Sequence, residues 1–346
     1  MLSPLDDFPI HQVAEPIRNV GTSDRNFYDR YYFNAAPCSG EAFVVLGMGQ
    51  YPNLGTKDAF ALVLHDGQHR VIRASDALGL DRMDTSVGPF RIEVVEGLKT
   101  LRFVVEPSEH DIALDLTWEA STPAIREPRH VDRSGTGRIF LDACRLAQTG
   151  RWTGTIEVAG TTLEVAPDEW WGTRDRSWGI RPSGESEPPG IQADLPFDGF
   201  RWMYAPMQFE DRSIYAILQE RNDGSRVLEE AVEMRADGSH RSLGRLDYAV
   251  EWDADERFVR RAQIHMGTIT VDVEVLNPVH VGVGTGYGFD AEWRHGQWHG
   301  GPVVQSRHWD LTTEEGRAPM WGIVDSISRF TLDGEVGYGL FEWMFL

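Results

Sequence analysis

Two stretches of this chain, separated by nearly half its length, follow one pattern of strands and turns. Residues 43–71 read FVVLGMGQYPNLGTKDAFALVLHDGQHRV, and residues 200–227 read FRWMYAPMQFEDRSIYAILQERNDGSRV. Each runs from an apolar strand through a rim of Met, Gln and aromatic residues into a second strand and a glycine turn. The opening phenylalanines, Phe43 and Phe200, lie 157 positions apart. A solenoid repeat is much shorter, so this spacing predicts two duplicated domains.

Further pairs of segments extend the repeat. Residues 101–120 and residues 258–277 each read as two successive strands, at a similar offset. Such two-strand patterns are typical of hairpins. Segments beginning at Gly150 and at Gly286 form a third candidate pair. The whole chain is therefore expected to consist of two copies of one β-rich unit.

A linker supplies the expected boundary between the copies. Residues 181–190, RPSGESEPPG, combine Pro, Gly, Ser and Glu, which is typical of a connecting segment. At 346 residues the chain also exceeds the size at which a single hydrophobic core usually stops growing. We therefore expect one domain over residues 1–183 and a second over residues 184–346.

Strand signals dominate both halves. Short runs rich in β-branched and aromatic residues alternate with Asp-Gly and Asn-Asp-Gly turns, which favour tight antiparallel hairpins. A domain of this kind closes into a barrel or folds as a sandwich, and a small barrel can enclose one apolar ligand. Helical periodicity is scarce, and residues 73–80 and 227–234 are the best short helix candidates. The expected fold class is all-β.

The charge and the cysteine content limit which partners the protein can bind and in which cellular compartment it is expected. The formal net charge of −21 repels phosphate backbones and anionic membrane surfaces, so we expect no nucleic-acid partner. Cys38 and Cys144 are the two cysteines; they fit a reducing compartment, although a single bridge between them stays open. Residues 1–20 lack the basic start and apolar run of a signal peptide, and no apolar run reaches the ~20 residues that span a bilayer. The sequence thus predicts a cytoplasmic protein without membrane insertion.

The densest chemistry in the chain lies at residues 170–182, WWGTRDRSWGIRP. This segment holds three tryptophans, three arginines and one carboxylate, that of Asp175. A guanidinium group carries five donors and no acceptor, and an indole offers a broad apolar face with one N–H, so both need partners when buried. The segment indicates a cationic, aromatic-walled cluster around one acid. It is either a structural element or the floor of a site.

This segment resembles the (G)xRDHSWGxR signature of the AttH-like, two-domain lipocalin (calycin) family. That family includes bacterial carotenoid hydratases and is structurally similar to fungal decalin-forming cyclases. The resemblance extends to residues 27–34, to residues 337–343 and to the duplicated organisation. One departure is Arg176, where the family pattern commonly has His. If that His carried a proton in relatives, this chain lacks the carrier, because arginine does not deprotonate in proteins.

The resemblance implies two lipocalin-like antiparallel β-barrels with a hydrophobic small-molecule ligand, isoprenoid or polycyclic, in or between them. It also implies a hydratase or cyclase type of lyase that uses no cofactor. Protonation of an alkene needs an acid, and aromatic faces stabilise the resulting cation. A non-catalytic carrier of the same ligand class is the alternative. Candidate catalytic residues are Asp175 and Tyr204, and candidate ligand-binding residues are Trp171, Arg174, Trp178, Trp202 and Met207.

Two interpretations of Asp175 stay open. Its sequence neighbours Arg174 and Arg176 would lower the pKa of its carboxyl if they paired with it, leaving a permanently ionised structural group. If they do not pair with it, the carboxyl can serve as an acid or base. Two other acids, Asp58 and Glu220, fall in or beside the repeated hairpins and are expected to be solvated charges.

The sequence gives little support for a metal site, a dinucleotide-binding site or a hydrolase motif. His295 and His299, with His308 and Asp310 further on, offer metal-ligand types, but the surrounding glycines favour a hairpin turn, so we expect no metal site. Residues 282–288, GVGTGYG, lack the spacing of a dinucleotide fingerprint and are expected to form a sharply bent barrel strand. Neither a G-x-S-x-G elbow nor a P-loop is present.

Overall fold

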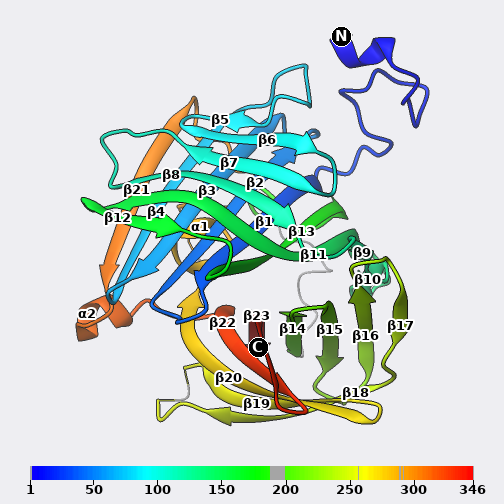
Figure 1. The fold of residues 1–346 in the computed structure, drawn as a ribbon. Helices are drawn as coiled ribbons and strands as arrows, with labels where there is room; N and C mark the ends of the chain where they lie inside the picture. Colours follow the sequence, from blue (N-terminus) through cyan, green and yellow to red (C-terminus); the bar gives the residue numbers. More distant parts are fainter. Residues whose placement is uncertain (1, 188–198, 256, 288–289, 291, 346) are drawn as a thin grey trace.

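The computed structural model describes residues 2–187, 199–255, 257–287, 290 and 292–345. Two curled antiparallel sheets account for most of them (Figure 1). The first sheet has fourteen strands: β1(Phe27–Pro37), β2(Ala42–Tyr51), β3(Thr56–His65), β4(Gln68–Ala77), β5(Ser86–Val87), β6(Phe90–Glu96), β7(Thr100–Val105), β8(Ile112–Ala120), β9(Ile125–Arg126), β10(His130–Arg133), β11(Ile139–Val158), β12(Thr161–Val165), β13(Trp170–Ile180) and β21(Val303–Asp310).

The second sheet has nine strands: β14(Phe200–Gln208), β15(Arg212–Arg221), β16(Arg226–Arg235), β17(His240–Ser242), β18(Leu246–Trp252), β19(Val259–Met266), β20(Ile269–His280), β22(Val324–Leu332) and β23(Glu335–Phe345). Three short helical turns complete the elements: η1(Pro4–Asp7), α1(Gly282–Thr285) and α2(Glu314–Arg317). Across the described ranges, no helix is long and apolar enough to cross a bilayer. The all-β expectation is confirmed.

The two sheets repeat one strand order. The first runs β4-β3-β2-β1-β13-β11-β8-β7-β6, and the second runs β16-β15-β14-β23-β22-β20-β19-β18. Residues 43–71 and 200–227 fall on the β2–β4 and β14–β16 hairpins, and residues 101–120 and 258–277 fall on β7–β8 and β19–β20. These two sequence pairs are confirmed as one duplication of a lipocalin-like half-barrel. The third pair is wrong, because Gly150 lies in β11 whereas Gly286 ends the turn α1.

Strand β1 breaks the symmetry of the duplication. It lies between β2 and β13 in the first sheet, antiparallel to both, whereas β14 pairs directly with β23 in the second sheet. The first sheet therefore contains one more strand at its centre. The inward-facing side chains of β1 have no counterpart in the other half of the chain.

A segment of the second half crosses to the first sheet. Strand β21 pairs with β4 from Val303 opposite Ser75 to Asp310 opposite Gln68, and so extends the β4 edge. Additional strand pairing at an edge satisfies backbone groups that would otherwise stay open. The predicted linker at residues 181–190 follows β13, and its last three residues lie outside the described ranges.

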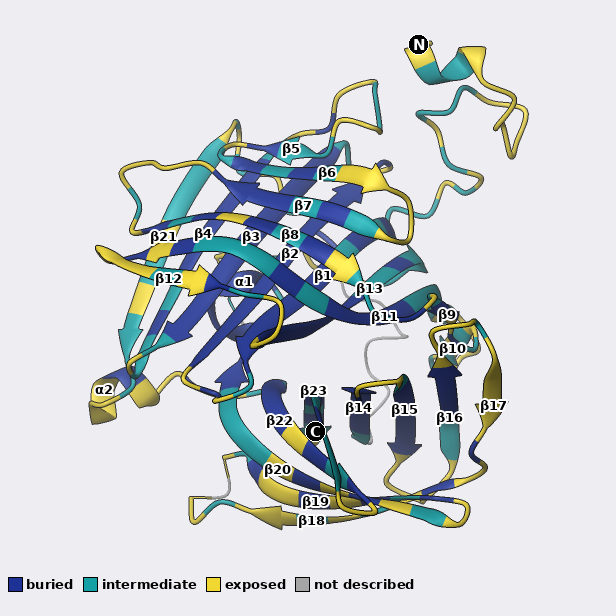
Figure 2. Cartoon of the chain, in the orientation of Figure 1, coloured by how far each residue is buried: buried dark blue, intermediate teal, exposed yellow. Residues whose placement is uncertain are grey.

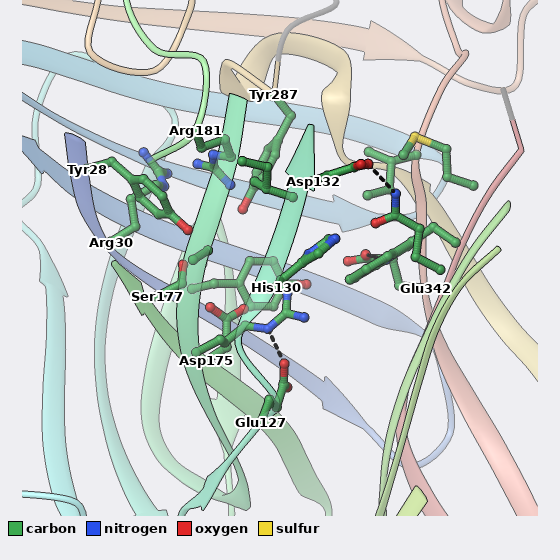
Figure 3. Close-up of a pocket in the computed structure, with 18 of the residues that line it drawn as sticks. Tyr28, Arg30, Glu127, His130, Asp132, Asp175, Ser177, Arg181, Tyr287 and Glu342 are labelled. Carbon is green, nitrogen blue, oxygen red and sulfur yellow. Dashed lines mark hydrogen bonds and ion pairs between the residues drawn. The ribbon is translucent and has the colours of Figure 1, made fainter. Parts of the chain in front are cut away.

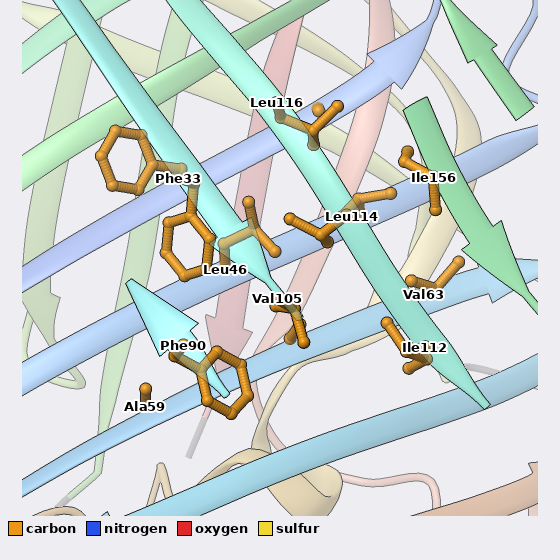
Figure 4. Packing of buried hydrophobic residues seen from close by; sticks show 14 of the residues in the cluster. Phe33, Leu46, Ala59, Val63, Phe90, Val105, Ile112, Leu114, Leu116 and Ile156 are labelled. Atoms are coloured by element: carbon orange, nitrogen blue, oxygen red, sulfur yellow. The ribbon is translucent and has the colours of Figure 1, made fainter. Parts of the chain in front are cut away.

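Three large apolar clusters stabilise the fold, beside a small one formed by Tyr28, Tyr51 and Ala143. One fills the first half-barrel (Figure 4) and another fills the second. The third lies between the two sheets and combines residues of β1–β4 with residues of β14–β16. Successive residues of a strand face opposite sides, so on β2 Val44 and Leu46 enter the barrel core while Phe43 and Val45 enter the intersheet cluster. Burial on both faces explains the continuous apolar runs in the sequence (Figure 2).

Three local expectations are wrong. Residues 73–80 and 227–234, expected as short helices, contribute to strands β4 and β16. Their pairing in a buried sheet outweighs weak local helical periodicity. Residues 282–285 form the turn α1 and not a barrel strand, because Gly284 and Gly286 adopt φ of +85° and +102°. Residue 288 of that segment lies outside the described ranges. Cys38 and Cys144 are both free thiols.

Candidate active site

A pocket of about 270 Å³ lies between the two sheets (Figure 3). The first sheet lines it with β1, β10, β11 and β13, and the second sheet lines it with β14, β15 and β23. This volume lies near the lower end for small-molecule pockets, roughly 300 Å³. The pocket therefore suits one compact ligand.

The register of three adjacent strands fixes the floor of the pocket. Strand β13 lies between β1 and β11, and alternate residues of all three face the second sheet. They form three rows of facing residues: Tyr32–Asp175–Ala147, Arg30–Ser177–Arg145 and Tyr28–Gly179–Ala143. The third row contains two small residues, Gly179 and Ala143. At Gly179, with φ of +137°, an added Cβ would lie 2.1 Å from the Asp142 carbonyl oxygen.

Asp175 faces this pocket without an arginine partner. Arg174 and Arg176 lie on the opposite face of β13, where Arg174 Nε donates to Gln148 at 2.9 Å and Arg176 pairs with Asp29. Strand alternation therefore separates the acid from both neighbours. Burial raises the pKa of Asp175 to about 7, and nearby Arg145 opposes that rise. The interpretation of Asp175 as an arginine-paired structural carboxylate is not supported.

Arg145 provides a cationic wall beside Asp175. Its Nε lies 2.5 Å from Glu127 Oε2, and its guanidinium carbon lies 5.3 Å from the Trp202 ring and 4.9 Å from the Tyr204 ring. His130 stacks on Trp202 with 6.0 Å between ring centroids. Burial lowers the pKa of His130 to about 4, so this imidazole is neutral at pH 7. Arginine and aromatic rings together form a rigid side of the pocket.

A pair of buried carboxyls on the second sheet faces the floor. Asp325 on β22 and Glu342 on β23 are directly opposed across the second sheet. The Tyr32 hydroxyl donates to Asp325, and the Trp202 indole N–H donates to Glu342. Burial raises the pKa of both carboxyls, and at Glu342 the neighbouring charge of Asp325 adds to the rise. Of the two, Glu342 lines the pocket.

Arg30 forms a buried cluster at the other end of the pocket. Its Nη1 donates to Asp58 Oδ1 at 2.7 Å and to the Tyr51 hydroxyl at 2.5 Å. The Gly296 N–H donates to the second oxygen of Asp58 at 2.6 Å. The expectation that Asp58 is a solvated charge is thus wrong, since it compensates a buried arginine. Glu220 is also largely buried and pairs with Arg226 at 2.9 Å.

Two glycines make room for Arg30. Gly47 and Gly49 lie on β2, next to β1, and a Cβ on Gly47 would lie 2.9 Å from Arg30 Nη2. A Cβ on Gly49 would lie 2.8 Å from Arg30 Nη1. The sequence signal for this cluster was therefore the alternate glycines of residues 46–50, LGMGQ.

The structure brings two of the predicted site residues to the pocket. Asp175 and Trp202 both line it, and Tyr204 lies immediately behind, beneath the Arg145 guanidinium. Trp202 and Tyr204 stack with 6.3 Å between centroids. Of the tryptophans predicted to bind the ligand, Trp202 thus lines the pocket, and Tyr204 supports it.

The remaining predicted residues lie elsewhere. Arg174 and Trp178 occupy the opposite face of β13, and Met207 lies in the core of the second half-barrel. Trp171 shares the face of Asp175 but contacts the Arg151 guanidinium at 4.7 Å and Tyr338 at 5.7 Å. None of these four lines the pocket. Sequence reasoning missed Arg30, Glu127, Arg145, Ser177, Arg181, Tyr287 and Glu342, which do.

The histidine segment serves packing. His295 is buried, with its Nε2 3.1 Å from the Thr285 carbonyl oxygen, and His299 stacks on Trp293 at 4.4 Å. His308 and Asp310 both contact Gln68 on β4. Among the residues described, no group of three or more His, Cys, Asp or Glu side chains could hold a metal ion.

The two facing half-barrel sheets define an AttH-like, lipocalin-type fold. An AttH protein from Nitrosomonas europaea is 14% identical, with a TM-score of 0.57, over 97% of this chain and 98% of that one. Kievitone hydratase from Nectria haematococca is 14% identical, with a TM-score of 0.54, over 94% of this chain and 93% of that one. CghA is 11% identical, with a TM-score of 0.50, over 93% and 88%. At such identities the similarity establishes the fold alone.

The chain itself belongs to a family of unknown function, DUF8625, whose model matches residues 2–346. None of the curated proteins compared with the chain matches it. The activity must therefore be argued from the site.

Proposed function

We propose that the protein binds a hydrophobic small molecule, isoprenoid or polycyclic, between its two half-barrels and acts on it as a hydratase or cyclase type of lyase. One observation carries this proposal: the Asp175 carboxyl faces an aromatic pocket and forms no ion pair with an arginine among the described residues. A pKa of about 7 leaves roughly half of the carboxyl protonated at neutral pH. Asp175 is thus equipped to donate a proton.

The reaction begins with proton transfer from Asp175 to an alkene carbon of the ligand. The O–H bond breaks, the π electrons form a C–H bond, and a cation develops on the neighbouring carbon. Water then supplies the C–O bond and returns a proton to the Asp175 carboxylate, so that alkene and water give an alcohol. In a cyclisation, a second π bond captures the same cation, and a proton lost from carbon restores Asp175.

The surroundings of Asp175 suit a developing cation. The Trp202 ring and the rings of Tyr28, Tyr32 and Tyr287 line the pocket, and an aromatic face attracts positive charge. Such a face contributes about 0.5–1 kcal/mol at an exposed site and about 2 kcal/mol where water is excluded. Ser177, one row along the floor, offers a hydroxyl that can orient a water molecule.

Isotope labelling tests the proposal. Wild-type protein is incubated in deuterium oxide with isoprenoid alkenes such as farnesol, and the products are analysed by mass spectrometry. Because the acid exchanges with solvent, the product must carry deuterium on carbon, and Asp175→Asn must abolish this labelling. Asp29→Asn, which changes an acid on the opposite face of the sheet, serves as the matched control.

Retention of these ligands without turnover by wild type and Asp175→Asn alike would contradict the lyase and leave a carrier. The carrier needs an apolar lining but no proton donor. Failure of the wild-type protein to bind any such ligand would contradict both.

A further inference from the structure

We propose that the ligand of this pocket carries a carboxylate, which Arg30 and Arg181 hold at the end of the pocket beside Tyr287. The inference rests on the proposed function for the location of the site and adds the substrate class. The ligand would be an acidic hydrophobic molecule, with its hydrocarbon body against the second sheet and its charged end against the first.

Arg30 is the first observation. Its side chain is buried, with the residue 2% exposed, and it lines the pocket. Nη1 is occupied by Asp58 and Tyr51, whereas Nη2 is buried without a hydrogen-bond partner. A buried charged donor without a partner loses its hydration and gains nothing in return. Nη2 is enclosed by protein atoms, so the Arg30 guanidinium must turn toward the pocket to donate to an oxygen atom of a bound ligand.

Arg181 is the second, independent observation. Its guanidinium carbon lies 4.5 Å from the Tyr28 ring centroid and 5.9 Å from that of Tyr287. Its Nη2 is also buried without a hydrogen-bond partner, and no ion pair joins Arg181 to any carboxylate in the described part of the chain. Arg30 approaches the same Tyr287 ring, at 5.8 Å. One ring thus brings two donor groups to one end of the pocket.

The charge balance of the pocket favours an anion. Arg30 is compensated by Asp58 and Arg145 by Glu127, both at ion-pair distance. Burial raises the pKa of the lining carboxyl Glu342, which lessens its negative charge. Arg181 therefore contributes a positive charge that no described side chain pairs with at close range.

The form of this site fits a carboxylate better than a phosphate. Arg30 and Arg181 each offer one edge of a guanidinium group, and the two oxygens of a planar carboxylate can accept from both. The single negative charge of a carboxylate also matches the one positive charge that is left unpaired. A phosphate ester carries about two negative charges at pH 7. Arg181 would compensate one of them, and the other would lie between aromatic rings without a positive partner. On the floor of the pocket, Arg30 is also a diagonal neighbour of Asp175, roughly 7–8 Å away between backbones. A held carboxylate would thus place the next few carbons of the ligand near the acid.

Matched ligands test this assignment. Farnesoic acid, farnesol and farnesyl phosphate share one hydrocarbon body, and their dissociation constants are measured by isothermal titration calorimetry at pH 7. We expect wild-type protein to bind farnesoic acid about tenfold or more tightly than farnesol, with farnesyl phosphate weaker than the acid. Arg181→Met should weaken the acid about tenfold and leave farnesol unchanged. Arg176→Met, an arginine on the opposite face of β13, is the matched control and should keep the preference.

The outcomes separate the two proposals. Equal or tighter binding of farnesol overturns the carboxylate site and leaves the hydrophobic pocket intact. Tighter binding of farnesyl phosphate overturns the choice of a carboxylate. An unchanged preference in Arg181→Met, with native circular dichroism, overturns the role of Arg181. No binding of any of the three contradicts the proposed function itself.

Discussion

Tyr32 and Asp175 lie directly opposite each other on β1 and β13, yet their polar groups serve different partners. The Tyr32 hydroxyl crosses to the second sheet and donates to Asp325, whereas the Asp175 carboxyl faces the pocket. Side chains opposed in this way lie about 4.5–5.5 Å apart at Cβ. In this row of the floor, Tyr32 therefore links the two sheets, and Asp175 places its carboxyl in the pocket between them.

The Tyr32–Asp325 hydrogen bond should contribute measurably to stability. Tyr32→Phe removes the hydroxyl and leaves Asp325 buried without this donor, at a cost of about 1–3 kcal/mol. Equilibrium unfolding in urea measures the change. Tyr31→Phe is the control, because no described residue hydrogen-bonds to the Tyr31 hydroxyl and its ring lies under Arg176. Equal stability of the two variants would contradict a structural role for this hydrogen bond.

Asp175→Asn should slow turnover strongly and change how stability depends on pH. General acid catalysis contributes about 10²- to 10⁴-fold, so a loss within that range is expected. The folded-state pKa of about 7 exceeds the ordinary value of 3.8, so the folded protein binds the proton more tightly. Asp175 therefore destabilises the fold progressively as pH rises from about 4 to about 7, and fully above that.

Denaturation of wild type and Asp175→Asn between about pH 4 and pH 7 measures how the stability difference changes with pH. The variant should gain stability relative to wild type with rising pH, by on the order of 2 kcal/mol, since one pKa unit is worth about 1.4 kcal/mol and the carboxyl keeps some contact with solvent. A pH-independent difference between the two proteins would mean that Asp175 titrates normally.

Glu127→Gln should move the pH profile of the reaction. Activity requires protonated Asp175, so it should fall as pH rises through about 7. The Glu127 carboxylate compensates Arg145 and helps to raise the pKa of Asp175; Glu342 acts in the same sense, and Arg145 and Arg181 oppose it. Removing the charge of Glu127 leaves Arg145 uncompensated and should shift the falling limb to lower pH. An unshifted limb, with reduced activity at every pH, would assign Glu127 a structural role alone.

Gly47→Ala should disturb the Arg30 cluster. The new Cβ would lie 2.4 Å from Phe60 Cε1 and 2.9 Å from Arg30 Nη2, so one of them must move. Overpacking of this kind costs about 1–3 kcal/mol, and the affinity for an acidic ligand should fall with it. Gly79→Ala is the matched control, because its Cβ meets nothing within 4 Å. Thermal unfolding and farnesoic acid titration of both variants provide the measurements.

The fold was largely readable from the sequence because hairpin turns, apolar strands and a long repeat are local or periodic signals. The wrong predictions concern segments whose structure depends on distant parts of the chain. Residues 73–80 and 227–234 are weakly periodic segments whose structure is decided by partners in a buried sheet. Strand β1, which has no repeat partner, could not be placed by comparing the halves.

The site was only partly readable. Asp175 was a candidate acid from the sequence, and the structure places it in the pocket; strand alternation alone would have set Arg174, Arg176 and Trp178 on the opposite face. Arg30 and Glu342 come from strands more than 300 positions apart, and only the packing of two sheets brings them to one pocket. No local pattern carries that information.

Native mass spectrometry of the protein purified from its own host tests the central claim most directly. The account predicts a co-purifying acidic hydrophobic molecule, retained by wild type and by Trp252→Ala but lost from Trp202→Ala. Trp202 lines the pocket, whereas Trp252 lies at the end of β18, outside it. A wild-type protein that carries no small molecule and binds none of the farnesyl ligands would contradict the account, as would a ligand retained equally by both variants.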